Sequence, residues 1–355
     1  MTGRPLRIAI VASNRHPIAE PFAGGMESHT WTLARGLQAR GHDVRVHAGA
    51  GSDPALGDVQ VLDERPLRLT AQARRDVSMP AEDFMRDHHA YQHLMLRLAG
   101  DSTVDVVHNN SLHYLPVAMA GMLPCPTVTT LHTPPTPWLE SAALTATASN
   151  TFVAVSAHTA SQWSAQVEVG RVISNGIDLD RWPVGDGSGG YAVWSGRLVP
   201  EKGPHLAVAA AALAGVPLLL AGPAPDRAYL RDVLLPVLGR GARWVGHVDQ
   251  AALAALVGAA SVAVVTPCWD EPYGLVVAEA LATGTPVAAF ARGAVPEVVD
   301  DSCASLAGGG DVEGLAAAIR RSLGLSRDAA RSHALRTCSS ERMIDDYERL
   351  FRAVA

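Results

Sequence analysis

The sequence predicts an α/β protein made of two doubly wound domains that face each other across a cleft. Short apolar runs with the composition of buried strands alternate with helical segments, which is typical of parallel sheets covered on both faces. The alternation stops over residues 175–190, where Gly, Asp, Ser and Pro accumulate, and then restarts. The 355 residues also exceed the roughly 250–300 residues at which single cores stop growing.

Each domain is predicted from its own series of strands. The expected strands are Leu6–Ala12, Asp43–Ala48, Val104–His108, Thr127–Leu131, Thr151–Val155, Tyr191–Trp194, Pro217–Ala221, Arg243–Val245, Ser261–Val265 and Pro286–Phe290. Helical spacing of apolar residues is clear over Met26–Arg40. We therefore expect a first domain at 1–180, a second at 191–339, and a helix within 340–355 that packs back on the first domain.

Composition excludes several classes of function. The formal net charge of −6 leaves no overall basic field for nucleic acid or anionic lipid. The four cysteines are scattered without a C-x-x-C pair, which favours a reducing, cytoplasmic compartment. The apolar run after Met1–Pro5 is too brief for a signal peptide. Gly215 and Pro217 split the apolar tract Leu206–Gly222 into a helix and a strand, so we expect no membrane-spanning segment.

Two glycines and a histidine mark the first domain's side of the predicted cleft. Gly24 and Gly25 follow the first strand and open the first helix, where doubly wound domains bind phosphate on free N–H groups. A plain tight turn is the alternative. His132 follows the strand Thr127–Leu131 and is expected at the cleft rim, as a hydrogen-bonding or a structural side chain.

Two cations follow the first strand of the second domain. Lys202 is the only lysine in the chain, and it stands five residues after Arg197 at a strand-to-helix turn. A compact ammonium next to a planar guanidinium can grip a diphosphate. An exposed loop lysine is the alternative.

The richest segment is Asp270–Glu279, which follows the strand Ser261–Val265. Gly274 stands where a helix should begin, so the first amides of that helix have no intrahelical acceptor. Glu279 lies one turn further among apolar residues, where a carboxylate is expensive to bury without a partner. Vicinal hydroxyls such as those of ribose would satisfy it, and Glu271 can reach a second polyol. Two surface glutamates are the alternative.

Taken together, these motifs resemble retaining glycosyltransferases of family 4, in order and over nearly the whole chain. The motifs are Gly24-Gly25, Asn175-Gly176-Ile177-Asp178, Gly-Arg-x5-Gly from Gly196 to Gly203, the Glu-x7-Glu pair Glu271/Glu279, Gly284-Thr285-Pro286-Val287 and Gly293-Ala294-Val295-Pro296-Glu297. The chain departs from the family at Ala294, where many members carry a second glycine. Trp269–Tyr273 and Glu201–His205 are most similar to the subgroup with antibiotic-pathway members.

The resemblance implies the GT-B fold and a nucleoside-diphosphate sugar donor that is bound mainly by the second domain. We take a uridine diphosphate sugar as the default donor, because such sugars are the commonest donors of the family. Arg197 and Lys202 should grip the diphosphate, and Glu279 should hold the ribose. Glu271, with the backbone of Tyr273, Gly274 and Leu275, should bind the donor sugar and phosphate. Gly24 and Gly25 should approach the diphosphate, and His132 should lie near the reacting face of the sugar.

The implied reaction moves a hexose to an acceptor hydroxyl with retention of configuration. No D-x-D signature follows a predicted strand, so we expect no metal and no cofactor. The mixed-charge segment Leu62–Arg86 lacks the large apolar residues of a membrane-inserting helix, which favours a small or glycan acceptor over a phospholipid. The oligomeric state is not predicted.

Three other functions are weaker. A nucleotide-sugar epimerase shares the architecture but needs acid and base groups across the sugar. A dehydrogenase is disfavoured because the glycine match at 185–190 precedes a strand instead of following one. A sugar-binding protein has no need of a diphosphate clamp. His88, His89 and His93 lie in a predicted helix, where the one-turn spacing of His89 and His93 can bind zinc. A polar helix face is favoured because no glutamate or third ligand stands at a suitable distance.

Overall fold

The computed structural model describes residues 4–62, 66–239 and 241–355. Within these residues the strands form two parallel sheets, one of seven strands in the order β3-β2-β1-β4-β5-β6-β7 and one of six in the order β10-β9-β8-β11-β12-β13. The first sheet contains β1 (Arg7–Val11), β2 (Asp43–Ala48), β3 (Asp58–Val61), β4 (Val106–Asn109), β5 (Thr127–Leu131), β6 (Asn150–Ala154) and β7 (Val169–Val172). The second contains β8 (Ala192–Ser195), β9 (Leu218–Ala221), β10 (Ala242–Trp244), β11 (Val262–Val265), β12 (Val287–Phe290) and β13 (Ala304–Ala307).

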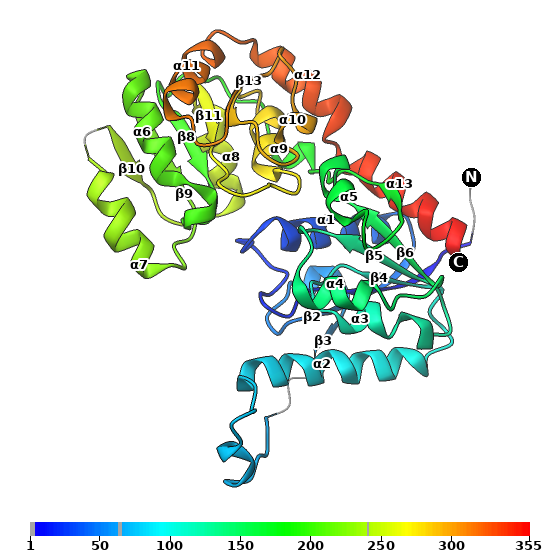
Figure 1. The fold of residues 1–355 in the computed structure, drawn as a ribbon. Coiled ribbons are helices and arrows are strands. Elements are labelled where there is room, and N and C mark those ends of the chain that lie inside the picture. Colours follow the sequence, from blue (N-terminus) through cyan, green and yellow to red (C-terminus); the bar gives the residue numbers. More distant parts are fainter. Residues whose placement is uncertain (1–3, 63–65, 240) are drawn as a thin grey trace.

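Helices cover both faces of each sheet (Figure 1). In the first domain they are α1 (Gly25–Ala39), α2 (Glu82–Ala99), α3 (Leu115–Ala118), α4 (Pro137–Ala143) and α5 (Ala157–Trp163). In the second they are α6 (Pro204–Ala214), α7 (Arg227–Tyr229), α8 (Gln250–Ala259), α9 (Leu275–Ala282), α10 (Val295–Val298), α11 (Val312–Ser322) and α12 (Arg327–Thr337), followed by α13 (Ser340–Val354). The prediction of two doubly wound domains is confirmed.

Each strand predicted from the sequence is present within two residues of its expected bounds. Alternation along the strands divides the core into layers, because successive side chains point to opposite faces. In β1, Ile8 and Ile10 pack with α1 and α13, whereas Ala9 and Val11 pack with α2. The apolar tract at 206–222 is split as expected into α6 and β9, and Gly215 ends the helix with a φ of 75°. Among the described residues, no helix combines the length and apolarity that a membrane crossing requires.

The last helix returns to the first domain. Met343, Tyr347 and Phe351 of α13 belong to the same buried cluster as Ile8 and Leu33. Figure 1 shows α13 lying along α1. The chain therefore crosses between the lobes twice, and the two crossings are paired, since the Ile177 amide donates to the Cys338 carbonyl at 2.8 Å and the Ser340 amide donates to the Ile177 carbonyl at 2.9 Å.

Candidate active site

A cleft of about 920 Å³ lies between the two domains, and both sheets contribute the ends of their strands to it. In each sheet the strand order reverses direction once, between β1 and β4 in the first and between β8 and β11 in the second. Ligands of doubly wound domains bind at such switch points, outside the carboxyl ends of the strands. The cleft is lined by all the predicted site residues, namely Gly24, Gly25, His132, Arg197, Lys202, Glu271, Tyr273, Gly274, Leu275 and Glu279.

The turn after β8 brings both predicted cations to the cleft. Arg197 follows the strand, and Lys202 ends a single 3₁₀ turn over Pro200–Lys202. The Arg197 guanidinium is only loosely held, since its nearest carboxylate, Glu201, is 3.9 Å away and both side chains are more than two-fifths exposed. Arg197 is thus free to reorient toward a ligand, while Lys202 is fixed by other contacts.

Lys202 and Glu271 form a close ion pair at the switch point of the second sheet. The ammonium Nζ lies 2.5 Å from Glu271 Oε2 and 5.0 Å above the centre of the Trp269 ring. The Trp269 indole N–H also donates to Glu271 Oε2, at 3.1 Å. Among the described residues no side chain donates to Glu271 Oε1, so one oxygen orients the carboxylate while the other remains able to accept from a ligand. Trp269 as a third partner was not predicted.

The helix α9 begins at the cleft in the expected manner. Gly274 precedes it with a φ of 97°, a left-handed conformation that favours glycine. No side chain caps this end, and the amides of Leu275 and Val276 have no acceptor among the described residues. The Tyr273 side chain is buried in the core, and burial raises the pKa of its phenol. Tyr273 can therefore serve the cleft only through its backbone.

Glu279 is a half-buried carboxyl group on the cleft side of α9. Burial raises the pKa of Glu279 from 4.5 to about 7. It makes no hydrogen bond or ion pair with any side chain in the described part of the chain. The free-energy cost of burying this unpaired carboxyl group can be offset by a ligand that donates two hydrogen bonds to it. The two hydroxyls of a ribose would do so.

The loop that carries Glu271 is shaped by the segment before α10. Gly293 has a φ of 62°, and a Cβ on it would lie 2.3 Å from both the backbone N and the backbone O of Glu271. The neighbouring Ala294 amide donates to the Glu271 carbonyl at 2.8 Å. Ala294 has an ordinary φ of −82°, so the departure from the family's second glycine is accommodated without strain.

The first domain approaches the same cleft through the start of α1. An ideal Cβ on Gly25 would lie 2.8 Å from Leu275 Cδ1 of the second domain, so the start of α1 comes close to the Leu275 side chain here. Glu27 lies in the first turn of α1, lines the cleft and is only 4% exposed. Sequence reasoning missed it, although a glutamate three residues after the residue that caps a helix is a recognised capping signal.

His132 is placed at the rim as predicted, but within a network that the sequence did not reveal. Its Nε2 is hydrogen-bonded to the Asn110 side chain, which in turn contacts Thr30. The His29 ring stands edge-on to it, with ring centres 4.9 Å apart. Burial, with repulsion from His29 and His108, lowers the pKa of His132 well below its usual range. The imidazole is therefore neutral at pH 7 and can hydrogen-bond a sugar hydroxyl.

A carboxylate of the second domain ties the two lobes together beside the cleft. Glu297 of α10 accepts from the amides of Ala157 and His158, at 2.8 and 2.7 Å, at the start of α5 in the first domain. The Thr159 hydroxyl adds a bond of 3.2 Å to the Pro272 carbonyl, next to Glu271. The relative position of the two walls is thus fixed within reach of the reactive groups.

Comparisons with known proteins give this site its family. The family model for Glycosyltransferase Family 4 matches residues 23–181, and that for Glycosyl transferases group 1 matches residues 190–324. Glycogen synthase of Mycobacterium tuberculosis (strain ATCC 25618 / H37Rv) is 30% identical, with 97% of this chain and 91% of that protein covered. The chain is a family 4 glycosyltransferase with the GT-B fold.

Further relatives of this glycosyltransferase have other names. D-inositol 3-phosphate glycosyltransferase of Mycobacterium avium (strain 104) is 29% identical, over 87% of this chain and 83% of that one. The crystal structure of Anabaena Alr3699/HepE in complex with UDP-glucose has a TM-score of 0.76 at 17% identity, and it covers 98% of this chain and all of its own (100%). At that identity, the structural likeness shows the fold alone.

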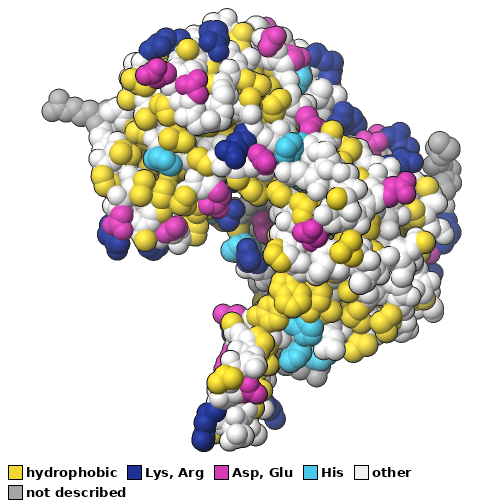
Figure 2. All heavy atoms as spheres, viewed as in Figure 1, with side chains coloured by type: hydrophobic (Ala, Val, Ile, Leu, Met, Phe, Trp, Pro, Cys, Tyr) yellow, Lys and Arg dark blue, Asp and Glu magenta, His cyan; other side chains and the backbone are white. Residues whose placement is uncertain are grey.

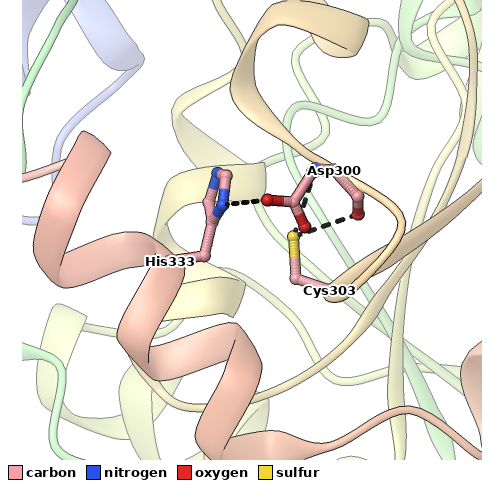
Figure 3. Close-up of side chains that lie close together, drawn as sticks. All are labelled: Asp300, Cys303 and His333. Atoms are coloured by element: carbon pink, nitrogen blue, oxygen red, sulfur yellow. Dashed lines mark hydrogen bonds and ion pairs between the residues drawn. The ribbon is translucent and has the colours of Figure 1, made fainter.

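Asp300, Cys303 and His333 lie as close together as the ligands of a metal ion, but their contacts within the protein give them a structural role (Figure 3). Asp300 Oδ2 lies 3.0 Å from His333 Nδ1, and His333 Nε2 lies 2.9 Å from the Val298 carbonyl. Both ring nitrogens of His333 are thus engaged by groups of the protein itself. Burial also raises the pKa of Cys303 to about 11, which keeps its thiol neutral. The group joins α12 to the loop after α10.

The two other candidate features lie on α2 and the segment before it. His88 is engaged by the Tyr114 hydroxyl at 2.8 Å, and His88, His89 and His93 form no metal-like group within the described residues. Asp63, Glu64 and Arg65 of the mixed-charge segment lie outside the described residues. The remainder, residues 66–81, extends away from the body as an arm (Figure 1). Asp178 and Asp180 form a D-x-D sequence in the linker, where the Asp178 side chain accepts from the Asp180 amide in a turn.

Proposed function

We propose that this glycosyltransferase transfers a hexose from a uridine diphosphate sugar to a hydroxyl group of a small or glycan acceptor, with retention of configuration and without a metal ion. The observation that carries the proposal is the meeting of four groups at one switch point: Lys202, Glu271, the open start of α9 and the unpaired Glu279. A sugar, a diphosphate and a ribose, in that order along a nucleotide sugar, match these groups in chemistry. A dehydrogenase or a simple sugar-binding protein would need no such set.

The donor-binding roles follow from charge. Arg197 and Lys202 hold the two phosphates, together with the amides of Leu275 and Val276 and the positive end of the α9 dipole. Glu279 accepts from both ribose hydroxyls. Glu271, oriented by Lys202 and Trp269, accepts from hydroxyls of the transferred sugar. The start of α1 at Gly24 and Gly25 approaches the diphosphate from the opposite wall.

The reaction exchanges one bond at the anomeric carbon for another. The bond from C1 to the phosphate oxygen breaks, and a bond from C1 to the acceptor oxygen forms on the same face. The acceptor's proton passes to the departing phosphate oxygen, so no side chain is assigned as a general base. Arg197, Lys202 and the α9 amides stabilise the negative charge that grows on the leaving group. His132, being neutral, orients the sugar without adding charge next to its cationic carbon.

The choice of uridine is supported by the UDP-glucose complex of Anabaena HepE, which shares the fold. The relatives' names point to different acceptors, a glucan in one and an inositol phosphate in another, so the family alone does not set the acceptor.

A cytoplasmic location is part of the proposal, and it is supported by four cysteines that all stay unpaired in the described residues.

The test is a release assay over a panel of UDP, GDP and ADP sugars, followed by mass analysis of the products. The expected result is acceleration of UDP release by an acceptor, with one hexose added to that acceptor and an unchanged anomeric configuration by NMR. Full activity after exhaustive chelation is also expected. Inversion of configuration, a strict metal requirement or interconversion of donor epimers without transfer would each overturn the corresponding part of the proposal.

A further inference from the structure

Three aromatic side chains of the first domain form a continuous surface at the mouth of the cleft. We call Phe84, Tyr114 and Trp138 the aromatic shelf. The Tyr114 and Trp138 rings are stacked with centres 5.1 Å apart, and Phe84 lies 5.7 Å from Trp138. The rings come from α2, from the residue before α3 and from α4. Because Tyr114 is also fixed by its hydrogen bond to His88, the shelf is held rigidly by three elements.

The aromatic side chains of the shelf are more exposed than aromatic side chains that only support the fold. Trp138 is 59% exposed and Phe84 is 38% exposed, although both contact other rings. Figure 2 shows hydrophobic and histidine side chains gathered where the arm leaves the first domain. Contiguous exposed aromatic surface usually marks a binding site, since rings of this size are normally buried.

The shelf is continuous with the active-site cleft. Phe84 lines the same cavity as His132 and Glu271, next to Tyr91 and His113, whose rings are stacked 4.2 Å apart. Trp138 lies on the helix that begins five residues after His132. Since Phe84 lines the cleft, a molecule held in the cleft can extend from it over the rest of the shelf.

Two carboxylates accompany the shelf on α2. Asp83 and Asp87 are one helical turn apart, and both line the cleft beside Phe84. Asp83 pairs with Arg86 on the same helix, and Asp87 accepts a hydrogen bond from Asn14 and lies 4.0 Å from His113 Nε2. Carboxylate oxygens accept hydrogen bonds from hydroxyl groups.

Aromatic faces next to carboxylates match one class of molecule. The face of a sugar ring carries C–H groups with partial positive charge, which attract the negative face of an aromatic ring. The hydroxyls at the edge of the same sugar donate to carboxylates.

We propose that the aromatic shelf is the acceptor subsite and that the acceptor is a carbohydrate, one of whose rings stacks on Phe84 and Trp138 while its hydroxyls bond to Asp83 and Asp87. This proposal rests on the transfer function proposed above and names its acceptor class. Arg15, an exposed cation that also lines the cleft, allows the carbohydrate to be neutral or to carry a phosphate, and the experiment separates the two.

The first arm of the test measures binding without any donor. Saturation-transfer NMR is recorded with the full chain and a fixed panel: methyl glucoside, methyl galactoside, methyl mannoside, methyl N-acetylglucosaminide, maltotetraose and glucose 6-phosphate. At least one probe is expected to bind, and Trp138→Ala and Phe84→Ala are each expected to weaken it about 10-fold. Trp138→Phe should keep most of the affinity. Leu144→Ala, an exposed change at the end of the same helix, should keep all of it.

The second arm measures UDP affinity of the same variants by calorimetry, which should not change because the shelf lies on the opposite wall from Lys202. The inference is overturned if no probe binds the unaltered protein, or if Trp138→Ala and Phe84→Ala bind the probes as tightly as it does. It is also overturned if the protein sediments with phosphatidylglycerol vesicles and Trp138→Ala abolishes that, since the shelf would then face lipid. Binding that depends on the shelf but no release of UDP from any donor would count against the transfer function alone.

Discussion

The two walls of the cleft are built differently. The second domain offers a compact set of charged side chains and backbone amides, all from the turns after β8 and β11, with Lys202 and Glu271 paired to each other. The first domain offers histidines and aromatic rings, drawn from α1, α2, α4 and the ends of β4 and β5, and its charged side chains, such as Asp83 and Asp87, are spread over separate elements and not gathered in one motif. A diphosphate is chemically constant, so it can be met by a short motif, whereas acceptors vary and are met by surfaces assembled from distant segments. The following changes break or sharpen that contrast.

The largest effect is expected for Glu271→Ala on the charged wall. Transfer should fall by about 10²–10³, the usual loss for one preorganised polar contact at a reacting group. UDP affinity should hold, because the change frees Lys202 to meet the diphosphate. Steady-state kinetics and calorimetry measure the two quantities, with Glu201→Ala in the neighbouring loop as the matched control. A variant that kept its full transfer rate would remove Glu271 from the mechanism.

Gly293→Ala should lower the transfer rate nearly as much as Glu271→Ala, although it removes no charged group. Its Cβ would lie 2.3 Å from the backbone of Glu271, so the loop must move. Misplacing a reactive group by about 1 Å costs on the order of 10² in rate. Ala294→Gly, one residue on, is the control and should transfer normally. Equal activity of both variants would show that Glu271 tolerates a shifted backbone.

Lys202→Met tests whether the wall recognises a diphosphate. UDP affinity should drop about 10- to 100-fold, because a hydrogen bond to a charged group is lost, while uridine affinity should stay nearly constant. Since Lys202 is the only lysine, a lysine-selective reagent gives an independent reading, and UDP should protect this residue from modification. Similar losses for UDP and uridine would contradict the clamp.

Glu279 makes the wall sensitive to pH. With a pKa of about 7, its carboxyl group is neutral below that pH and ionised above it. UDP should therefore bind about 10-fold more tightly at pH 8 than at pH 6, since the ionised form accepts from both ribose hydroxyls. Glu279→Gln should flatten the profile. A profile that survives in the Gln variant would assign the titration to another group.

The same shift has an opposite consequence for stability. The folded-state pKa is raised above its ordinary value of 4.5, so the free energy of unfolding falls as pH rises between these two values. Without nucleotide, Glu279→Gln should thus raise the melting temperature at pH 8 and leave it unchanged at pH 4. Thermal unfolding at the two pH values measures this difference.

The smallest effect is expected away from both walls. Hydrogen bonds from the Ser302 hydroxyl and amide, with a smaller contribution from His333, lower the pKa of Asp300 to about 2. This carboxylate therefore stabilises the fold above its ordinary pKa and loses that contribution as pH falls toward 2. Asp300→Asn should cost about 1 kcal/mol at pH 7 by urea unfolding. Added zinc should not change the stability of the unaltered chain, and a zinc-dependent gain would reinstate Asp300, Cys303 and His333 as a metal site.

The sequence predicted the central strands because they are continuous apolar runs. It missed β3, β7 and β13, which are three of the four edge strands in the described sheets, whereas the fourth, β10, was predicted. An edge strand is covered on fewer sides and can therefore carry less apolar sequence, as in Asp-Val-Gln-Val of β3 and Val-Gly-Arg-Val of β7. Edge position thus weakens the apolar signal of a strand without always removing it.

The residues of the candidate site also divide into those that the sequence predicted and those that it did not. Residues at strand ends and helix starts were predicted, because the fold class itself brings such positions together. The support of Glu271 by Trp269 and Gly293, the partnership of His132 with Asn110 and the aromatic shelf were not predicted. Each of these depends on side chains that meet only after tertiary packing, and neither spacing nor composition encodes such a meeting.

The return of α13 to the first domain has a consequence for biogenesis. Its Met343, Ile344, Tyr347, Leu350 and Phe351 complete a core that begins with the first strand. During synthesis, domains usually fold in the order in which they leave the ribosome. Here residues 340–354 are made after the whole second lobe, so the first lobe can bury this part of its apolar interior only once the second lobe has emerged.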